Sequence, residues 1–573
     1  MNAALFLIIG VAVLIVGYIF YGGWLAKKWG VDNSRVTPAH ELEDGKDYCP
    51  AKAPVLMGHH FSSIAGAGPI NGPIQAAVFG WVPVMLWVLI GGIFFGGVHD
   101  FGALFASIRH KGESIGEVIG DAIGARAKKL FIIFAYLTLI LVVAAFASIV
   151  ANTFKATYVD GVLDKAASAA NASTAIISIM FILMAIIFGF FVYRRNAPLG
   201  ISTVIGVIGI AVCMYIGLQW HPIYLSGNTW MIIVGLYIAI ASVTPVWILL
   251  QPRDYLSSFL LYAMMVLAVV GIIGCHPTVD MPAFTGFKDT LAPSGTSLGY
   301  MFPALFVTIA CGAVSGFHSL VSSGTSSKMI SNEKDMRLVG YGSMCAEVVL
   351  GIVSLVVVCA AATNGALPAG TPFQTFSHSV AGFLQDIFGV PADIAACILT
   401  MCVSALALTS VDAVARIGRM SLQELFQPAP GKEKTFIQKI FTNVVFSTVL
   451  TLVCGFALCM AGYMSVWPLF GSANQLLSAL VLTGLAVFLK ATGRKGWMLY
   501  VPMTLMFIVT MTALVEAVVR IFGQIANGTF VFMVGGLQLI VAFALIVLAL
   551  LVVYHCVAKL REPAPVKAVA QAE

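Results

Sequence analysis

Histidine and hydroxyl side chains occur in stretches of this chain that are otherwise apolar enough to cross a membrane. The stretch from Gly58 to Pro73, GHHFSSIAGAGPINGP, holds two adjacent histidines, a pair of serines and four glycines. A helix that only crosses lipid would consist mainly of Leu, Ile, Val and Phe. Imidazole titrates near neutral pH and hydroxyls donate hydrogen bonds to anions, so these residue types predict proton transfer and the binding of a small anion.

Residues that interrupt a helix accompany these side chains. Pro69 and Pro73 each remove a backbone donor. Gly66 and Gly68 lower the cost of leaving the helix. Irregular backbone survives inside hydrocarbon only where protein or a water-filled cavity surrounds it. We therefore expect the helix to stop near Gly66 and to restart near Asn71 as its N-cap, with unpaired N–H groups and a positive dipole end that suit a carboxylate.

Two further stretches look similar. SGFHSLVSSGTSSK, from Ser315 to Lys328, carries a glycine, a histidine and another glycine at the spacing of Gly58, His60 and Gly66. SVWPLFGSANQLL, residues 465–477, is a third irregular span. Paired interruptions are typical of the two-fold core of secondary transporters. The alternative interpretation is that these spans are only kinked helices packed by small residues.

The polar and glycine positions of these stretches form the predicted substrate site. We expect the first stretch to face the second, so that a helix end and several donors meet one ligand. The predicted substrate-binding residues are Ser62, Ser63, Gly66, Gly68, Asn71, Ser322, Ser323, Thr325 and Asn474.

A second set of residues is predicted to couple transport to protons. Glu347 lies inside an apolar run, where an ionised carboxylate costs about 3 kcal/mol, so it is either a proton carrier or a hydrogen-bonded anchor. The histidines cluster near the inner ends of their spans. The predicted proton-coupling residues are His59, His60, His99, Asp100, His318 and Glu347.

The composition defines the elements that must position these residues. Of 573 residues, 60% are hydrophobic and only 10% are charged, against about 25% in soluble domains. Runs of about 20 apolar residues predict an all-α polytopic membrane protein with broken helices and about fifteen crossings. They are 3–21, 58–79, 82–98, 129–152, 174–193, 199–219, 229–250, 256–275, 298–317, 338–362, 391–412, 440–460, 465–489, 496–519 and 530–555.

The basic residues predict the topology. With the N-terminus outside and the C-terminus inside, 27 of the 31 Lys and Arg residues fall on the inner side, as the positive-inside rule expects. This bias requires 58–79 to cross the membrane. We divide the chain into a first span with a basic inner loop (1–57), a transport core with peripheral helices (58–556) and a cytoplasmic tail (557–573).

The sequence lacks the motifs of nucleotide-driven, cofactor-dependent and metal-binding proteins. There is no G-x-x-x-x-G-K-[ST] motif and no C-x-x-C pair, so we predict no nucleotide motor, cofactor or metal site. No hydrophilic stretch is long enough for a soluble catalytic domain. The net charge of +6 lies in loops on one side and does not indicate nucleic acid as a partner. Membrane lipid surrounds the chain, and protein partners stay open.

Several motifs together resemble the carbon starvation protein A family over nearly the whole chain. They are GHHFSSIAGAGPINGP, GWVPVMLW, GGVHDF, SIRHKGESIGE, SGFHSLVSSGTSSK and FGSANQLL. The resemblance implies a proton-coupled carrier of the bacterial inner membrane, linked to uptake of pyruvate and of peptides when carbon is scarce. It also implies an inverted-repeat core, distantly similar to amino acid–polyamine carriers, with peripheral helices added.

The leading hypothesis is a secondary importer of a small carboxylate, pyruvate first, by proton symport. An anion entering a negative-inside cell is opposed by about 2.3 kcal/mol per charge at 100 mV, so a cation must accompany it, and we favour protons over sodium. A peptide is the alternative substrate and would need a larger cavity and a partner for its ammonium group. Two other classes are an intramembrane hydrolase, with His318 and Ser322 at i and i+4, and a transporter-like starvation sensor. We expect no enzyme.

Overall fold

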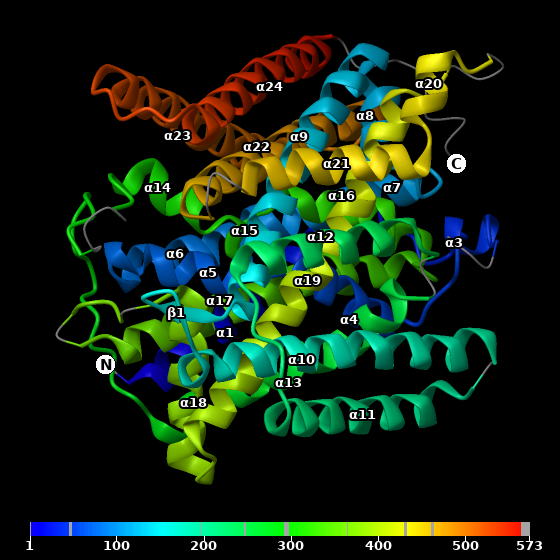
Figure 1. The fold of residues 1–573 in the computed structure, drawn as a ribbon. Helices are drawn as coiled ribbons and strands as arrows, with labels where there is room; N and C mark the ends of the chain where they lie inside the picture. Colours follow the sequence, from blue (N-terminus) through cyan, green and yellow to red (C-terminus); the bar gives the residue numbers. More distant parts are fainter. Residues whose placement is uncertain are drawn as a thin grey trace.

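The fold is almost entirely helical. The computed structural model describes residues 2–44, 48–195, 197–245, 248–291, 297–363, 365–368, 370–428, 433–459 and 463–562. Within these ranges the named strands are β1 (Thr157–Val159) and β2 (Val162–Asp164), which pair antiparallel with Tyr158 opposite Leu163. Asp160 and Gly161 join them with positive φ angles of 50° and 80°, as a two-residue hairpin turn requires. Figure 1 shows this hairpin at the edge of a helical bundle.

Eleven helical segments among the described residues are long and apolar enough to cross a membrane. In chain order they are Ala3–Trp29 (α1 Ala3–Val16 and α2 Gly23–Trp29), Trp81–Arg109 (α6 Trp81–Gly91 and α7 Gly97–Arg109), Ala125–Phe154 (α9), Lys165–Val192 (α10 Lys165–Gly189), Leu199–Gln219 (α11), Leu250–Cys275 (α13), Glu333–Ala361 (α17 Ser343–Ala361), Ala392–Leu425 (α19), Val466–Ala491 (in α22, Tyr463–Ala491), Trp497–Ala526 (α23 Tyr500–Ala526) and Leu537–Arg561 (α24).

Four of the predicted crossings coincide with shorter helices. Residues 229–250 and 440–460 correspond to α12 (Gly227–Val243) and α21 (Val444–Cys459). The other two, 58–79 and 298–317, coincide with interrupted helices. The predicted all-α membrane fold is therefore confirmed, while the count of fifteen crossings, the inverted-repeat core and the boundaries 1–57, 58–556 and 557–573 stay predictions.

The first interrupted span stops as predicted but restarts earlier. Helix α4 (Ala53–Ile64) ends just before Gly66, and α5 begins at Gly68 and runs to Ala76. The prediction that Asn71 caps α5 was wrong, because its backbone N–H donates to Ala67 O at 3.1 Å inside the first turn. Proline is favoured in the first helical turn, so Gly68 and Pro69 start the helix without a polar N-cap.

The second interrupted span has three pieces. They are α14 (Met301–Thr308), α15 (Ala310–Ala313) and α16 (Gly316–Gly324). The first break follows His60 and the second precedes His318, so the matched spacing of the two histidine motifs does not superpose the two breaks. The third stretch, 465–477, is helical throughout, with Pro468 accommodated inside α22.

The two interrupted spans pack against each other at glycines. A Cβ on Gly72 would lie 2.6 Å from Thr308 O and 2.9 Å from Ile309 Cα, so only glycine allows α5 to approach α14 so closely. A Cβ on Gly68 would lie 2.5 Å from Cys311 Cβ. Figure 1 shows α5, α15 and α17 together in the middle of the molecule.

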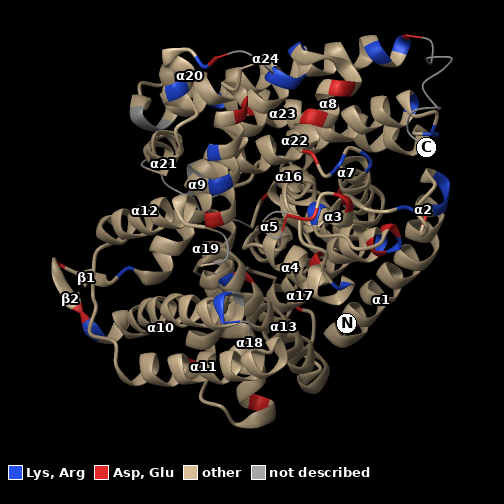
Figure 2. Ribbon diagram, turned by 90° about the vertical axis from the view of Figure 1, so that its right-hand side faces the viewer, with Lys and Arg blue, Asp and Glu red and all other residues tan. Residues whose placement is uncertain are grey.

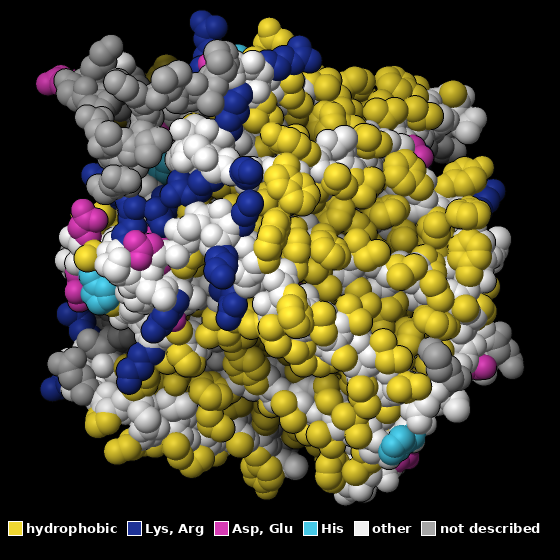
Figure 3. Space-filling model, turned by 180° about the vertical axis from the view of Figure 1, so that it is seen from behind, with side chains coloured by type: hydrophobic (Ala, Val, Ile, Leu, Met, Phe, Trp, Pro, Cys, Tyr) yellow, Lys and Arg dark blue, Asp and Glu magenta, His cyan; other side chains and the backbone are white. Residues whose placement is uncertain are grey.

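The surface divides into an apolar belt and a basic side. Most of the apolar stretches of α9, α19 and α22 are buried, whereas only about a quarter to a third of those of α11, α23 and α24 is buried. Hydrophobic side chains cover most of the face in Figure 3, and Lys and Arg gather along its left edge. That edge is the right-hand side of Figure 1, where α3 and α20 lie. Figure 2 looks onto this side and shows Lys and Arg at the ends of α2, α9 and α24.

One long helix lies outside the predicted crossings. Helix α18 (Pro372–Phe388) begins with a capping box between Thr371 and Gln374 and packs against α13 and α19. Its polar residues, among them His378 and Gln385, hid it from a search for continuous apolar runs. The remaining helices are short: α3 (Pro38–Glu41), α8 (Ile115–Ile123) and α20 (Phe436–Phe441).

Candidate functional site

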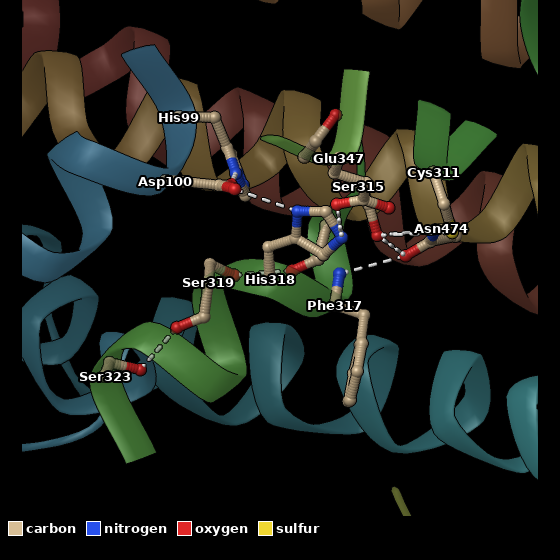
Figure 4. A network of polar contacts seen from close by, with 12 residues as sticks. His99, Asp100, Cys311, Ser315, Phe317, His318, Ser319, Ser323, Glu347 and Asn474 are labelled. Carbon is tan, nitrogen blue, oxygen red and sulfur yellow. Dashed lines mark hydrogen bonds and ion pairs between the residues drawn. The ribbon is translucent and has the colours of Figure 1, made fainter. Parts of the chain in front are cut away.

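Four titratable side chains meet inside the bundle, and we call them the histidine centre: His99 and Asp100 of α7, His318 of α16 and Glu347 of α17. None of these side chains is exposed to solvent. Figure 4 shows His318 between Asp100 and Glu347. The sequence predicted each of the four separately, and the structure brings them into one connected group.

The contacts run in a line through the centre. Asp100 uses both carboxylate oxygens: Oδ1 lies 2.7 Å from His99 Nδ1, and Oδ2 lies 2.8 Å from His318 Nδ1. The other ring nitrogen of His318, Nε2, lies 3.3 Å from Glu347 Oε2. This last pair is within ion-pair distance but makes no hydrogen bond among the described residues. The order is therefore His99, Asp100, His318, Glu347.

The geometry calls for a proton at the His318–Glu347 contact. An ionised Asp100 accepts from both Nδ1 atoms, so His99 and His318 each carry a proton on Nδ1. If His318 Nε2 and Glu347 were both unprotonated, a lone pair would face a carboxylate oxygen at 3.3 Å in a buried site, which is unfavourable. One proton on either atom removes the repulsion. The geometry therefore favours one proton shared at this contact, and the proton-coupling role of the four residues stays a prediction.

Close backbone approach positions the two helices that supply Asp100 and Glu347. A π-helical turn, η7 (Arg337–Gly342), precedes α17, and a Cβ on its Gly340 would lie 3.0 Å from Phe101 Cα. A second π-helical turn, η3 (Gly92–Gly96), precedes α7. Such turns often mark functional sites, because they rotate the following residues out of the regular helical register.

The side chain of Asn474 fixes the start of α16. Its Oδ1 accepts a hydrogen bond from Phe317 N at 2.9 Å, and its Nδ2 donates to Ser315 Oγ at 2.9 Å (Figure 4). The amide therefore satisfies backbone and hydroxyl groups that the break leaves open. Asn474 thus positions the helix that carries His318, and its predicted contact with substrate stays a prediction.

Cys311 of α15 lies beside the centre. One ligand atom from each of Cys311, His318 and Glu347 lies within 4.8 Å of the others, a spacing at which a metal ion could bridge them. The sequence offered no metal-binding spacing because the three residues come from three separate segments. The absence of a metal site therefore stays a prediction.

His59 and His60 belong to a different neighbourhood. His60 is buried, and its Nδ1 lies 2.7 Å from Ser326 Oγ, which links α4 to the segment after α16. His59 is half-buried, and its carbonyl accepts hydrogen bonds from Ser62 Oγ and Ser63 Oγ at 3.0 and 2.8 Å. Neither histidine makes a hydrogen bond or ion pair with the centre among the described residues.

The predicted substrate residues divide into bonded and open groups. Ser323 and Thr325 donate to the carbonyls of Ser319 and Val321, as hydroxyls in helices commonly do. The Asn71 amide and the Ser322 hydroxyl are buried without a hydrogen-bond partner among the described residues. The first turn of α5, after Gly66, also has no side-chain cap. The open polar groups thus lie on α5 and α16, the helices that follow the two breaks.

Sequence reasoning missed a second buried polar group, which we call the arginine cluster: Tyr237 of α12, Arg253 and Asp254 of α13, and Asp412 of α19. Arg253 is one of the 27 basic residues predicted on the inner side, but its side chain is only 1% exposed and lies in the first turn of α13. The adjacent charged residues Arg253 and Asp254, at the edge of an apolar run, were the signal in the sequence that could have indicated this cluster.

The hydrolase alternative lacks its central contact. Both ring nitrogens of His318 are directed at carboxylates, Nδ1 at Asp100 and Nε2 at Glu347. Ser322 Oγ makes no hydrogen bond to His318, so no serine–base pair forms in the part of the chain that the structure describes.

Comparison with known proteins gives a consistent answer. The family model described as carbon starvation protein CstA matches residues 2–367 and 360–513. Peptide transporter CstA of Escherichia coli (strain K12) is 32% identical over 585 residues, covering 89% of this chain and 80% of that protein. Pyruvate/proton symporter BtsT of the same organism is 30% identical over 602 residues, covering 89% and 81%. Among solved structures, a mutant of the manganese transporter of Eremococcus coleocola matches with a TM-score of 0.46 and 11% identity, over 91% of this chain and 99% of that one.

The relatives are named as transporters, and the helices of this chain are long and apolar enough for a multi-pass membrane protein. The chain is a transporter and not an enzyme. Because the family model and the relatives match most of its length, it belongs to the carbon starvation protein CstA family.

Proposed function

We propose that this transporter imports a small carboxylate, pyruvate first, together with protons across the bacterial inner membrane, with its N-terminus outside and its C-terminus inside. The observation that carries the proposal is the buried line of His99, Asp100, His318 and Glu347 beside a broken helix. Carrier sites commonly lie at such breaks. The relative named Pyruvate/proton symporter BtsT supports both the substrate and the coupling ion.

The proton has a defined place in this proposal. It resides between His318 Nε2 and Glu347 Oε2 and is released when the two helices separate in the inward-facing state. Two or more protons per pyruvate would make the step electrogenic and would let the membrane potential drive accumulation. His99 and Asp100 hold the tautomer of His318, as a second partner of an imidazole generally does.

The substrate is placed between the two interrupted spans. The uncapped start of α5, the open Asn71 amide and the open Ser322 hydroxyl supply hydrogen-bonding groups for the polar atoms of the substrate. A peptide is the second candidate, because several relatives are named Peptide transporter CstA. A transporter-like sensor would bind the same ligand without sustained flux.

Uptake into proteoliposomes tests the proposal. Purified protein is assayed with labelled pyruvate, lactate and dialanine under an imposed inward pH gradient, an inward sodium gradient or neither. We expect pyruvate to accumulate with the pH gradient only, and to do so equally in the presence of a chelator such as EDTA. Accumulation driven by sodium alone would contradict the proton assignment. Loss of uptake with EDTA that zinc or manganese restores would contradict the prediction of no metal site. Accumulation of dialanine but not pyruvate would make the peptide the substrate.

A further inference from the structure

The arginine cluster lies against the break between α4 and α5. Ser62 Oγ in the last turn of α4 donates to Asp254 O at 3.4 Å. On the other side, a Cβ on Gly66 would lie 2.6 Å from Ser410 Oγ, one half-turn before Asp412 on α19. Helices α13 and α19 therefore contact the two sides of the first break. The arginine cluster lies at these contacts, because Asp254 belongs to α13 and Asp412 to α19.

Among the described residues, only NH1 of the Arg253 guanidinium makes hydrogen bonds, while NH2 is within ion-pair distance of Asp254 Oδ1 at 3.6 Å. NH1 donates to Asp412 Oδ2 and to the Tyr237 hydroxyl, which itself donates to Asp412 Oδ2 at 2.8 Å. Nε and NH2 have no hydrogen-bond partner among the described residues, although the side chain is 1% exposed. Leaving buried donors unused is costly, so an unused edge of this kind is the mark of a site that awaits a partner.

The Nε–NH2 edge has a specific shape. Its two parallel N–H donors match the two oxygens of a carboxylate, and such bidentate contacts are both stronger and more selective than a point charge. Arginine is also the cation that stays charged when buried. The free edge of Arg253 therefore has the chemistry to recognise a carboxylate.

The charges around this edge impose a condition on binding. Arg253 contacts two aspartates, since NH2 also lies 3.6 Å from Asp254 Oδ1, so the contacting groups sum to one negative charge when both aspartates are ionised. Among the described residues, Arg416 of α19 also acts on both aspartates through its charge, and its NH2 donates to the Ala241 and Thr244 carbonyls at the end of α12. A carboxylate on the free edge would add a like charge beside Asp254, which one bound proton would remove.

We propose that Arg253 binds the substrate carboxylate through its Nε–NH2 edge, and that protonation of the neighbouring Asp254 is the condition for that binding. The inference rests on the proposed import of a carboxylate and adds the residue that recognises it. Anion and proton then load at one place, because each improves the binding of the other by the same factor. The ligand class is a carboxylate, either of a 2-oxo acid or of a peptide C-terminus.

The first test measures the affinity of purified protein for pyruvate and for dialanine by titration calorimetry. Arg253→Lys keeps the charge but removes the fork, and we expect it to raise the Kd at least about tenfold, as the loss of one charge-assisted contact does. The matched control is Arg419→Lys. Arg419 is also a buried arginine but lies on α19, so this variant should bind like the wild type. Unchanged affinity in Arg253→Lys overturns the assignment.

The second test does not depend on that variant folding. In the wild type, pyruvate affinity should rise as the pH falls between 8 and 5, while pyruvate itself stays ionised. Asp254→Asn carries the neutral form permanently, so its affinity should be high and independent of pH. A pH dependence equal to that of the wild type would contradict the role of Asp254. If the wild type binds neither ligand, the proposed function fails and this inference fails with it, whereas wild-type binding that ignores both variants overturns this inference alone.

Discussion

His318 Nε2 lies 3.3 Å from Glu347 Oε2, and both atoms are buried without a hydrogen bond among the described residues. The other ring nitrogen of the same imidazole, Nδ1, lies 2.8 Å from Asp100 Oδ2. The ring is therefore fixed in one orientation with one nitrogen free to exchange a proton. Both carboxylates come from helices that run beside the second break, so movement there changes the contact directly.

Glu347→Gln should uncouple transport from protons. The amide keeps the size and can donate to His318 Nε2, but it cannot bind and release a proton. We expect accumulation driven by a pH gradient to fall at least about a hundredfold, in line with the loss of a proton-transfer group, while counterflow exchange of labelled pyruvate persists. Exchange lost together with accumulation would mean that Glu347 serves binding or folding.

Asp100→Asn should lower both stability and rate. Only one of its two side-chain atoms can accept, so either His99 or His318 would face an N–H₂ group and lose its partner. An unsatisfied buried donor costs about 1–3 kcal/mol, which thermal unfolding in detergent should detect together with slower uptake. Asp121→Asn on α8, where the side chain is 65% exposed, is the control and should change neither.

These two predictions show what sequence could and could not supply. The break after α4 was readable because Gly66, Gly68 and Pro69 are local signals that hold in any fold. The contact between His318 and Glu347 was not readable, since it depends on how α16 packs against α17. Local rules alone predict Asn71 as the N-cap of the second helix. In the structure the helix begins earlier, at Gly68 and Pro69.

Arg253 illustrates a further limit of sequence reasoning. A basic residue at the end of an apolar run reads as part of a loop by the positive-inside rule. Its partner Asp412 lies on another helix, so only the folded bundle shows that the pair is buried. Helix α18 was not predicted because its apolar residues are interrupted by polar ones. The capping box at Thr371 is the local signal that marks its start.

Gly72→Ala should disturb the contact between the two interrupted spans. The added methyl group would lie 2.6 Å from the backbone oxygen of Thr308, which no side-chain rotation can relieve. We expect a lower unfolding temperature and slower pyruvate uptake. Gly523→Ala on α23 has nothing within 4 Å of the added atom and should behave as the wild type, or become slightly more stable because alanine favours helices. Equal behaviour of the two variants would contradict the packing argument.

Asn474→Ala should affect transport as well as stability. It removes the acceptor for Phe317 N and the donor to Ser315, and loss of a cap typically costs about 1 kcal/mol. Because α16 carries His318, the coupling ratio should fall too. Asn443→Ala removes an exposed cap of α21, where Oδ1 accepts from Val445 N and Phe446 N, and should cost stability without changing transport. Normal coupling in Asn474→Ala would separate the cap from the histidine centre.

The most direct measurement of the central claim is proton entry during substrate entry. Liposomes that contain the protein and a trapped pH-sensitive dye receive a pulse of pyruvate with no pH gradient imposed and with the membrane potential clamped. For the wild type we predict acidification of the interior in step with labelled pyruvate, and for Glu347→Gln none. Pyruvate entry without acidification in the wild type, or the same acidification in Glu347→Gln, would contradict the account.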